Sequence, residues 1–166
     1  MKIAVFSDIH DNILNLEKFF TAIKSQNVTQ LICLGDFINP GIVKRIIDSG
    51  YKTYAVWGNN DGEKVVITRF AEQSKGNFEI SNNCEGIFNI DGKKVYTNHY
   101  PEIAPTVAKS GDFDAVFYGH NHEQYYQKLE NGCILCNPGE ISGHKTGKVT
   151  YAIWDTEAKE VVSYKL

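Results

Sequence analysis

Short apolar runs of strand length recur along the first third of the chain. They cover residues 3–6, 30–34 and 53–57, and the four consecutive apolar residues of the first run indicate a strand buried on both faces. A segment with apolar residues at helical spacing follows the first run, and helix-start signals follow the other two. The order strand, helix, strand, helix, strand, helix predicts parallel strands joined by helical crossovers.

Capping residues place the starts of the three helices. Asp11 is expected to cap a helix over residues 13–23, whose apolar side chains follow helical spacing. Asn39-Pro40 predicts the cap and first residue of the second helix. Asp61 is expected to open the third helix, which runs to about residue 73.

The second half of the chain is rich in strand patterns. Residues 86–90 and 93–97 flank an Asp-Gly dipeptide and predict a β-hairpin. A short helix is expected over 101–109, and a buried strand over 115–118. Further strands are predicted over 124–129, 133–136, 149–154 and 160–164. The whole pattern predicts an α/β (α+β) fold in which residues 1–166 form one domain of two packed sheets flanked by helices.

Composition narrows the class of protein. The chain has 166 residues, 42% of them hydrophobic and 22% charged, as is typical of a globular protein. Its net charge of −3 without a basic cluster argues against tight nucleic-acid binding. No apolar run is long enough to cross a bilayer, and no signal-peptide pattern opens the sequence, so we expect no membrane association and a cytoplasmic location.

Four cysteines raise the question of a redox or zinc site. Cys133 and Cys136 have C-x-x-C spacing, but they lie in a predicted strand, where a spacing of three places the two thiols on opposite faces. No second C-x-x-C completes a zinc site. Buried structural thiols are the favoured interpretation, without a disulfide framework.

Polar residues suited to metal binding follow five of the predicted strands. These residues are Asp8, His10, Asp36, Asn59, His99, His120 and His122. In open α/β sheets such residues gather beyond the carboxyl ends of the strands. If the backbone stays extended, Asp8 and His10 face the same side, and so do the last two histidines.

Seven ligands exceed the four that close a structural zinc site. Two adjacent divalent ions that share a carboxylate fit the set better, and Asp36 is the candidate bridge. Ions about 3.5–4 Å apart serve in-line displacement at phosphorus, because they bind the phosphate oxygens and activate a bridging water. Each residue also has a separate explanation. Asp8 and Asp36 could be helix caps, Asn59 could occupy a left-handed turn position, and His99 could be a loop residue. Taken together, these separate explanations are much weaker than one site.

The ordered motifs resemble the calcineurin-like metallophosphoesterases, in particular the small single-domain YfcE/MJ0936-type phosphodiesterases. The motifs are Asp8-x-His10, Gly35-Asp36, Gly58-Asn59-Asn60-Asp61, His99, Gly119-His120-x-His122 and Asn137-Pro138-Gly139, and they cover essentially the whole chain. The resemblance implies a sandwich of two mixed sheets with helices outside. It also implies a division of ligands, with Asp8, His10, Asp36 and His122 on one metal and Asp36, Asn59, His99 and His120 on the other.

Two departures from that family bear on function. Many phosphomonoesterases of the superfamily carry Gly-Asn-His-Glu, whose histidine protonates the leaving group, whereas this chain has Asn60 and Asp61 there. Loss of an acid matters most for poor leaving groups, so activated diesters should react most easily. The family's Thr-His-Gly-His is here Asn98-His99-Tyr100-Pro101, so Tyr100 is a candidate to cover the site.

The expected function is therefore hydrolysis of a small phosphodiester by a metal-bridging hydroxide, with Asp36, Asn59 and His99 as catalytic residues. The cofactors would be two divalent ions, Mn²⁺ first and Ni²⁺, Fe²⁺ or Zn²⁺ as alternatives. The alternative is a non-catalytic interaction scaffold like the retromer subunit Vps29, which has the same fold. The family also implies self-association as a dimer or tetramer. His144 is expected to be a solvated loop residue, although contact with substrate is the alternative.

Overall fold

The chain forms eleven strands and four helices, described over all residues 1–166 in a computed structural model. The helices are α1 (Ile13–Lys24), α2 (Pro40–Asp48), α3 (Lys64–Gln73) and α4 (Ala104–Lys109). The strands are β1 (Lys2–Phe6), β2 (Val28–Cys33), β3 (Lys52–Ala55), β4 (Phe78–Ile80), β5 (Glu85–Ile90), β6 (Lys93–Asn98), β7 (Ala115–Tyr118), β8 (Tyr125–Lys128), β9 (Ile134–Asn137), β10 (Thr150–Asp155) and β11 (Glu160–Lys165).

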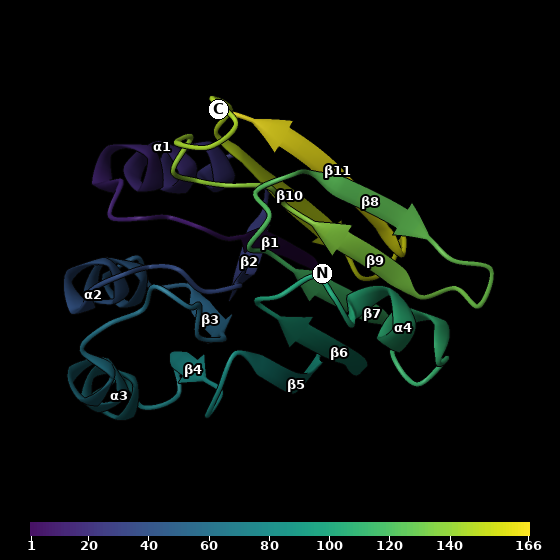
Figure 1. The fold of residues 1–166 in the computed structure, drawn as a ribbon, viewed down its shortest axis with the longest axis horizontal. Coiled ribbons are helices and arrows are strands. Elements are labelled where there is room, and N and C mark those ends of the chain that lie inside the picture. The colour runs from purple at the N-terminus through teal and green to yellow at the C-terminus, as the bar shows by residue number, and fades with distance from the viewer.

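Two mixed sheets pack against each other, with helices on their outer faces (Figure 1). The six-stranded sheet has the order β11-β10-β1-β2-β3-β4, and the five-stranded sheet has the order β5-β6-β7-β9-β8. Strands β1 to β4 are parallel, as the alternation of strands and helices predicted. The predicted α/β (α+β) fold of two packed mixed sheets flanked by helices is confirmed.

The apolar side chains form three layers of core. One lies between α1–α3 and the six-stranded sheet, one between the two sheets, and a smaller one beneath α4. Strand β1 shows why residues 3–6 are all apolar: Ala4 and Phe6 face the helices, while Ile3 and Val5 face the other sheet. Each large apolar side chain buried in this way stabilises the fold by about 1.5–3 kcal/mol.

The capping residues agree with the sequence at α2 and differ at α1 and α3, although α1 begins at Ile13 as expected. Asn39 caps α2 as predicted, because its side chain accepts hydrogen bonds from the Gly41 and Ile42 N–H groups. Helix α1 is capped by Asn12 instead of Asp11, whose φ of +58° places it in the turn before the helix. Helix α3 begins at Lys64, three residues after Asp61, because the Asp61 carboxylate is used elsewhere.

The Asp91-Gly92 dipeptide turns the predicted hairpin between β5 and β6. Both residues have positive φ, 53° and 69°, which is the requirement of a type I′ turn. Two other elements differ from the sequence prediction. Strand β4 is absent from the sequence prediction, because three residues give too little pattern. Helix α4 begins three residues later than expected and has Pro105 in its first turn.

The cysteines are free thiols, as expected. Cys133 packs in the core beneath α4, whereas Cys136 packs between the sheets, so the two lie on opposite faces. No helix has the length and apolar character needed to cross a membrane.

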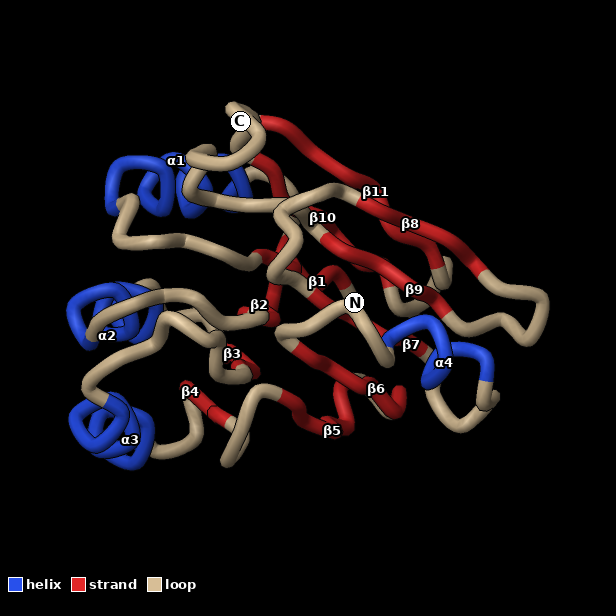
Figure 2. Tube along the Cα trace, viewed as in Figure 1, coloured by secondary structure: helices blue, strands red, loops and turns tan.

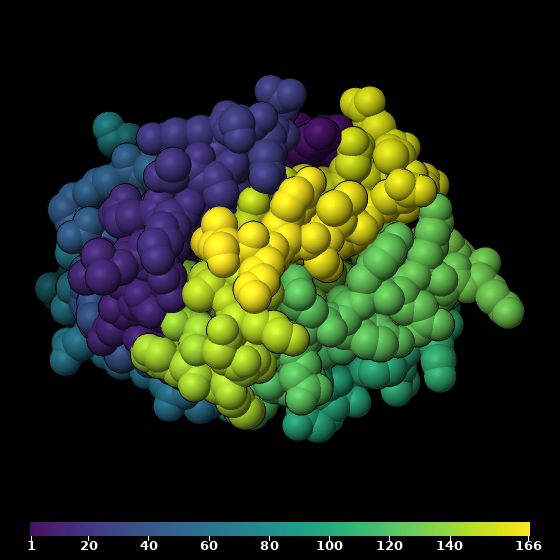
Figure 3. Space-filling view, turned by 90° about the horizontal axis from the view of Figure 1, so that it is seen from above, coloured from purple at the N-terminus to yellow at the C-terminus, as the bar shows by residue number.

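Loops from the parallel strands run toward one side of the molecule. In Figure 2 the tan loops that leave β1, β2 and β3 all lead to helices on the same side of the sheet. Viewed from above, the yellow C-terminal strand crosses the surface between the purple α1 region and the green segments of the five-stranded sheet (Figure 3). The carboxyl ends of the parallel strands are therefore where polar loops from both sheets can meet.

Candidate metal centre

The seven predicted site residues lie in loops that follow parallel strands of both sheets. In chain order, Asp8 and His10 follow β1, Asp36 follows β2, Asn59 follows β3, His99 follows β6, and His120 and His122 follow β7. The structure brings all seven together, although they span more than a hundred positions of the sequence.

Left-handed backbone conformations, not extended strands, direct five of these seven side chains. The φ angles of Asp8, His10 and Asp36 lie between 44° and 54°, and those of His120 and His122 are 69° and 67°. The prediction that these pairs face one side because the strand continues is therefore wrong. Residues in this region of φ cost conformational energy and cluster at functional sites, where the surrounding structure holds them in place.

Asp8, His10 and His122 form the first cluster. The Nε2 atom of His122 lies 3.3 Å from Asp8 Oδ1, and that of His10 lies 3.8 Å from the same oxygen. Burial alone would raise the pKa of Asp8, but the neighbouring His10, Ser7 and His122 outweigh it and lower the pKa below its usual value. Asp8 in turn raises the pKa of His10. Positive charge is favoured at this cluster.

Asn59, His99 and His120 form the second cluster with Asp36. His99 Nε2 lies 3.0 Å from Asn59 Oδ1, 3.2 Å from His120 Nδ1 and 3.7 Å from Asp36 Oδ2. Burial and the neighbouring His99 lower the pKa of His120, which favours the neutral imidazole needed in a metal ligand.

The two aspartates connect the clusters. Asp36 Oδ2 lies 3.4 Å from His10 Nε2 and 3.7 Å from His99 Nε2, so it faces one histidine of each cluster. Asp8 also belongs to both of the tight groups of candidate ligand atoms, one with His10 and His122 and one with Asp36 and His99. The role of Asp36 as a bridge between two ions stays a prediction.

Hydrogen bonds at Nδ1 orient the rings of two of these histidines. His99 Nδ1 lies 2.7 Å from the Leu34 carbonyl, and His122 Nδ1 lies 2.8 Å from the Glu140 carboxylate. Both partners can only accept, so each Nδ1 carries a proton, and in the neutral ring each Nε2 turns a lone pair into the site. These lone pairs face Asn59 Oδ1 and Asp8 Oδ1, oxygens that cannot donate a proton.

Two further buried atoms, Asp8 Oδ1 and His10 Nε2, have no hydrogen-bond partner. Buried polar atoms are normally paired, so an unpaired carboxylate oxygen and an imidazole nitrogen at one place fit metal coordination. Mixed oxygen and imidazole donors suit divalent ions such as Mn²⁺, Fe²⁺, Ni²⁺ or Zn²⁺.

Close packing of the loops depends on glycine. A Cβ atom on Gly58 would collide with the Asp36 carboxylate, and one on Gly35 would collide with the Gly58 backbone. Gly35 also has a φ of +92°, which side chains rarely adopt. The loops after β2 and β3 therefore approach closely enough to present Asp36 and Asn59 together.

Asp61 holds the same two loops in place and is not a helix cap. Its carboxylate accepts hydrogen bonds from the N–H groups of Gly58 at 2.6 Å, Ile38 at 2.8 Å and Asp36 at 3.1 Å. Burial, together with the nearby Asp36, raises the pKa of Asp61 despite these donors. The Asn60 side chain donates to Asp36 Oδ2 at 2.8 Å. At the place of the family's acid motif, Asp61 is thus bonded to the loop backbone and Asn60 to the Asp36 carboxylate.

Two residues border the ligand set. The Tyr100 ring packs edge-on against His99 and His120, with ring centroids 5.2 and 4.9 Å away, so it lies against the second cluster as suggested. His144 is exposed, and its ring centroid lies 6.5 Å from that of His10.

Glu140 was not recognised in the sequence. It is completely buried and accepts hydrogen bonds from His122, Ser142 and Thr146. Burial alone would raise the pKa of Glu140, but these donors hold the pKa at about 2. The only signal was its position directly after Asn137-Pro138-Gly139, which does not reveal burial.

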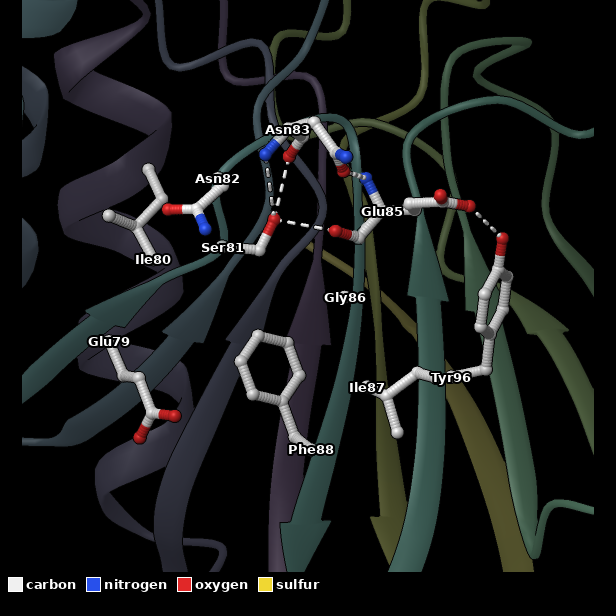
Figure 4. Close-up of a pocket in the computed structure, with 10 residues that line it drawn as sticks. All are labelled: Glu79, Ile80, Ser81, Asn82, Asn83, Glu85, Gly86, Ile87, Phe88 and Tyr96. Carbon is white, nitrogen blue, oxygen red and sulfur yellow. Dashed lines mark hydrogen bonds between the residues drawn. The ribbon is translucent and has the colours of Figure 1, made fainter.

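A pocket elsewhere on the molecule lies away from these ligands. It has a volume of about 470 Å³ and is bordered by β4, β5, the loop between them and Tyr96 (Figure 4). None of the seven predicted residues lines it, and its polar groups largely bond to one another, as Tyr96 does to Glu85 at 2.6 Å. Its concave shape does not bring together groups suited to phosphoryl chemistry.

Known archaeal phosphodiesterases resemble the chain over nearly its whole length. The chain is 32% identical to phosphodiesterase MJ0936 of Methanocaldococcus jannaschii over 162 residues, which covers 96% of each protein. The solved structure of a novel archaeal phosphodiesterase matches with a TM-score of 0.90 and 32% identity over the full length of both chains.

More distant structures share the fold. YfcE, a phosphoesterase from E. coli, matches with a TM-score of 0.67 at 20% identity, over 100% of this chain and 98% of its own. Vps29 of Chaetomium thermophilum matches with a TM-score of 0.68 at 14% identity, over 100% and 97%. The sequence model of the calcineurin-like phosphoesterase superfamily domain covers residues 1–159, and the chain belongs to this family.

Proposed function

We propose that this protein is a two-metal phosphodiesterase whose ions are held by Asp8, His10, Asp36, Asn59, His99, His120 and His122. The observation that carries the proposal is the convergence of imidazole lone pairs and carboxylate oxygens from loops of both sheets. The similarity to phosphodiesterase MJ0936 supports diesters as the substrate class. When bound, two divalent ions supply charge stabilisation for the phosphate oxygens and an activated water.

The residues of this chain have distinct parts in the proposed site. Asp8 and Asp36 supply the negative charge that holds two cations close together. The Leu34 carbonyl and Glu140 fix the tautomers of His99 and His122, so that both rings present Nε2 to the ions. Tyr100 limits the space beside the second cluster.

The geometry also favours diesters with good leaving groups. Asp61 accepts three backbone N–H groups, and Asn60 donates to Asp36, so neither is placed to protonate a leaving oxygen. A leaving group of low pKa departs without an acid, whereas an alkoxide requires one. The expected substrate is therefore a small phosphodiester with at least one activated ester bond.

Domain organisation and assembly belong to the same proposal. Residues 1–166 are proposed to act as one metallophosphoesterase domain, because the ligands come from both sheets and the sheets share a core. Self-association as a dimer or tetramer stays a prediction, and size-exclusion chromatography with light scattering tests it.

Hydrolysis of model esters tests the proposed function. The protein would be stripped with a chelator, supplied with Mn²⁺, Ni²⁺ or Zn²⁺ in turn, and assayed with bis(p-nitrophenyl) phosphate and p-nitrophenyl phosphate. We expect metal-restored hydrolysis, with the diester cleaved much faster than the monoester. Absence of turnover with every metal in folded protein would contradict it and favour the interaction-scaffold alternative. A monoester preference would contradict the assignment of the substrate class.

A further inference from the structure

A buried carboxylate outside the ligand set joins the metal centre to a surface loop. Glu140 follows β9, and its side chain has no exposed surface. One oxygen, Oε2, accepts the Nδ1–H of His122 at 2.8 Å. The same carboxylate accepts hydrogen bonds from the loop at residues 142–146, which we call the Glu140 loop.

The Glu140 loop wraps around this carboxylate. The N–H groups of His144, Lys145 and Thr146 point to it, at 3.1, 3.1 and 2.6 Å. The hydroxyls of Ser142 and Thr146 donate to it as well. Successive backbone N–H groups around one anion form an anion-binding concavity. Here the bound anion is a side chain of the protein itself.

We infer that Glu140 is a positioning residue that couples the order of the Glu140 loop to the metal affinity of His122. The inference rests on the proposed role of His122 as a metal ligand. Because one carboxylate is bonded to both the ligand and the loop, a displacement of either changes the hydrogen bonds available to the other. A bound ion that fixes His122 therefore also fixes the anchor of the loop.

The Glu140 loop also lies next to residues at the edge of the candidate site. Ile141, just before the loop, and Ser142, its first residue, donate their N–H groups to the carbonyls of Ser7 and Asp8 at 3.0 and 2.9 Å. The loop then carries His144 to within 6.5 Å of the His10 ring, measured between centroids. Loss of the hydrogen bonds to Glu140 would allow the Glu140 loop to move at the edge of the site, while the β-sheet core stays intact.

Glutamine cannot replace Glu140 in this arrangement. If the single amide oxygen of glutamine accepts the His122 Nδ1–H, its NH₂ group faces the N–H groups of Lys145 and Thr146. All of these groups are hydrogen-bond donors, so no hydrogen bond can form between them. If the amide turns over, its NH₂ group faces His122 and the tautomer of the ligand is no longer fixed. Glu140→Gln thus has nearly the shape of the wild-type side chain and separates charge from size.

The test compares Mn²⁺ affinity in wild-type protein, Glu140→Gln and Glu130→Gln, by titration calorimetry. Glu130 is an exposed glutamate in the β8–β9 turn and serves as the matched control for loss of one charge. We expect Glu140→Gln to weaken Mn²⁺ binding by about 10- to 100-fold, as is typical for an outer-shell partner of a ligating histidine. Glu130→Gln is expected to bind as the wild type does.

Amide hydrogen exchange provides a readout that does not depend on activity. In wild-type protein, Mn²⁺ should slow the exchange of the His144, Lys145 and Thr146 amides, and in Glu140→Gln it should not. If Glu140→Gln fails to fold, Thr146→Val removes one donor to Glu140 without touching His122. It should speed exchange in the loop and weaken Mn²⁺ binding measurably, by up to about tenfold.

Two results would overturn the inference while leaving the proposed function in place. One is unchanged Mn²⁺ affinity in folded Glu140→Gln, or in Thr146→Val if the first variant does not fold. The other is loop exchange in the wild type that does not respond to Mn²⁺. Failure of the wild type itself to bind Mn²⁺, Ni²⁺ or Zn²⁺ would contradict both the proposed function and this coupling.

Discussion

The six-stranded and five-stranded sheets contribute different chemistry to the same site. Loops of the six-stranded sheet supply every oxygen donor, from Asp8, Asp36 and Asn59, and one imidazole. Loops of the five-stranded sheet supply imidazoles only, from His99, His120 and His122. Each candidate cluster combines donors from both sheets. Neither sheet could hold the proposed ions alone, so the site depends on how the two sheets pack.

The two halves also differ in how their loops are held. In the six-stranded sheet, Asp61 and the close approach of Gly35 and Gly58 bind the loops to each other. In the five-stranded sheet, single hydrogen bonds at Nδ1 orient His99 and His122. The Asp61 carboxylate and close glycine packing thus hold the carboxylate half, and bonds at Nδ1 orient two of the three imidazoles of the other half.

Asp36→Asn should have the largest effect, because it removes the charge that faces both clusters while keeping the shape of the side chain. We expect a loss of diesterase kcat of about 10³-fold or more, on the basis of several kcal/mol of transition-state stabilisation. Bound metal, measured by elemental analysis, should fall, and the circular dichroism spectrum should not change. Asp112→Asn, at an exposed position, is the control. Full turnover in Asp36→Asn would show that this carboxylate is not the bridge.

Removal of metal should lower the free energy of unfolding, because the proposed ions join loops of the two sheets. At a free Mn²⁺ concentration 100 times the dissociation constant, binding adds about 2.7 kcal/mol to the free energy of unfolding. Chelator should therefore lower Tm in a thermal melt, and Mn²⁺ should restore it. An equal Tm with chelator and with saturating Mn²⁺ would count against an ion bound only to the folded site.

Gly58→Ala tests the packing of the carboxylate half. The new Cβ would collide with Asp36, so the loops after β2 and β3 must move apart, at a cost of about 1–3 kcal/mol in unfolding free energy. Urea denaturation measures this cost, and diesterase activity should fall with it. Gly62→Ala is the matched control, because its Cβ would make only ordinary contact, 3.6 Å from the Ile38 carbonyl. Equal stability of the two variants would refute the packing requirement.

His144→Ala should have the smallest effect, since His144 is exposed and belongs to neither cluster. We expect Mn²⁺ affinity to stay unchanged and kcat/KM to fall by less than about tenfold, the equivalent of one exposed contact. Steady-state kinetics with bis(p-nitrophenyl) phosphate measures it. A loss as large as that of Asp36→Asn would mean that the loop histidine acts directly in the reaction.

Much of the fold follows from local pattern. The buried run of β1, the Asn39 cap of α2 and the Asp91-Gly92 hairpin turn are determined by residues next to one another in sequence. Strand β4 is too short to be recognised in this way, and its position depends on pairing with β3. The local sequence around Asp61 is typical of a helix cap. Its carboxylate instead accepts hydrogen bonds in tertiary contacts with two loops.

The site shows the same limit. Residue types at strand ends indicated a shared centre, and the seven side chains do lie together. Their convergence, however, relies on left-handed backbone at residues such as Asp8 and His120, which an extended-strand argument cannot supply. Glu140 stayed hidden because nothing in its neighbours shows that it is buried beside His122.

Crystals soaked in Mn²⁺ and measured for anomalous scattering test the central claim most directly. The account predicts two peaks per chain about 3.5–4 Å apart, with Asp36 between them and histidines from the five-stranded sheet at both. A single peak, or peaks contacted by only one of the two sheets, would contradict a two-ion centre built jointly by the sheets.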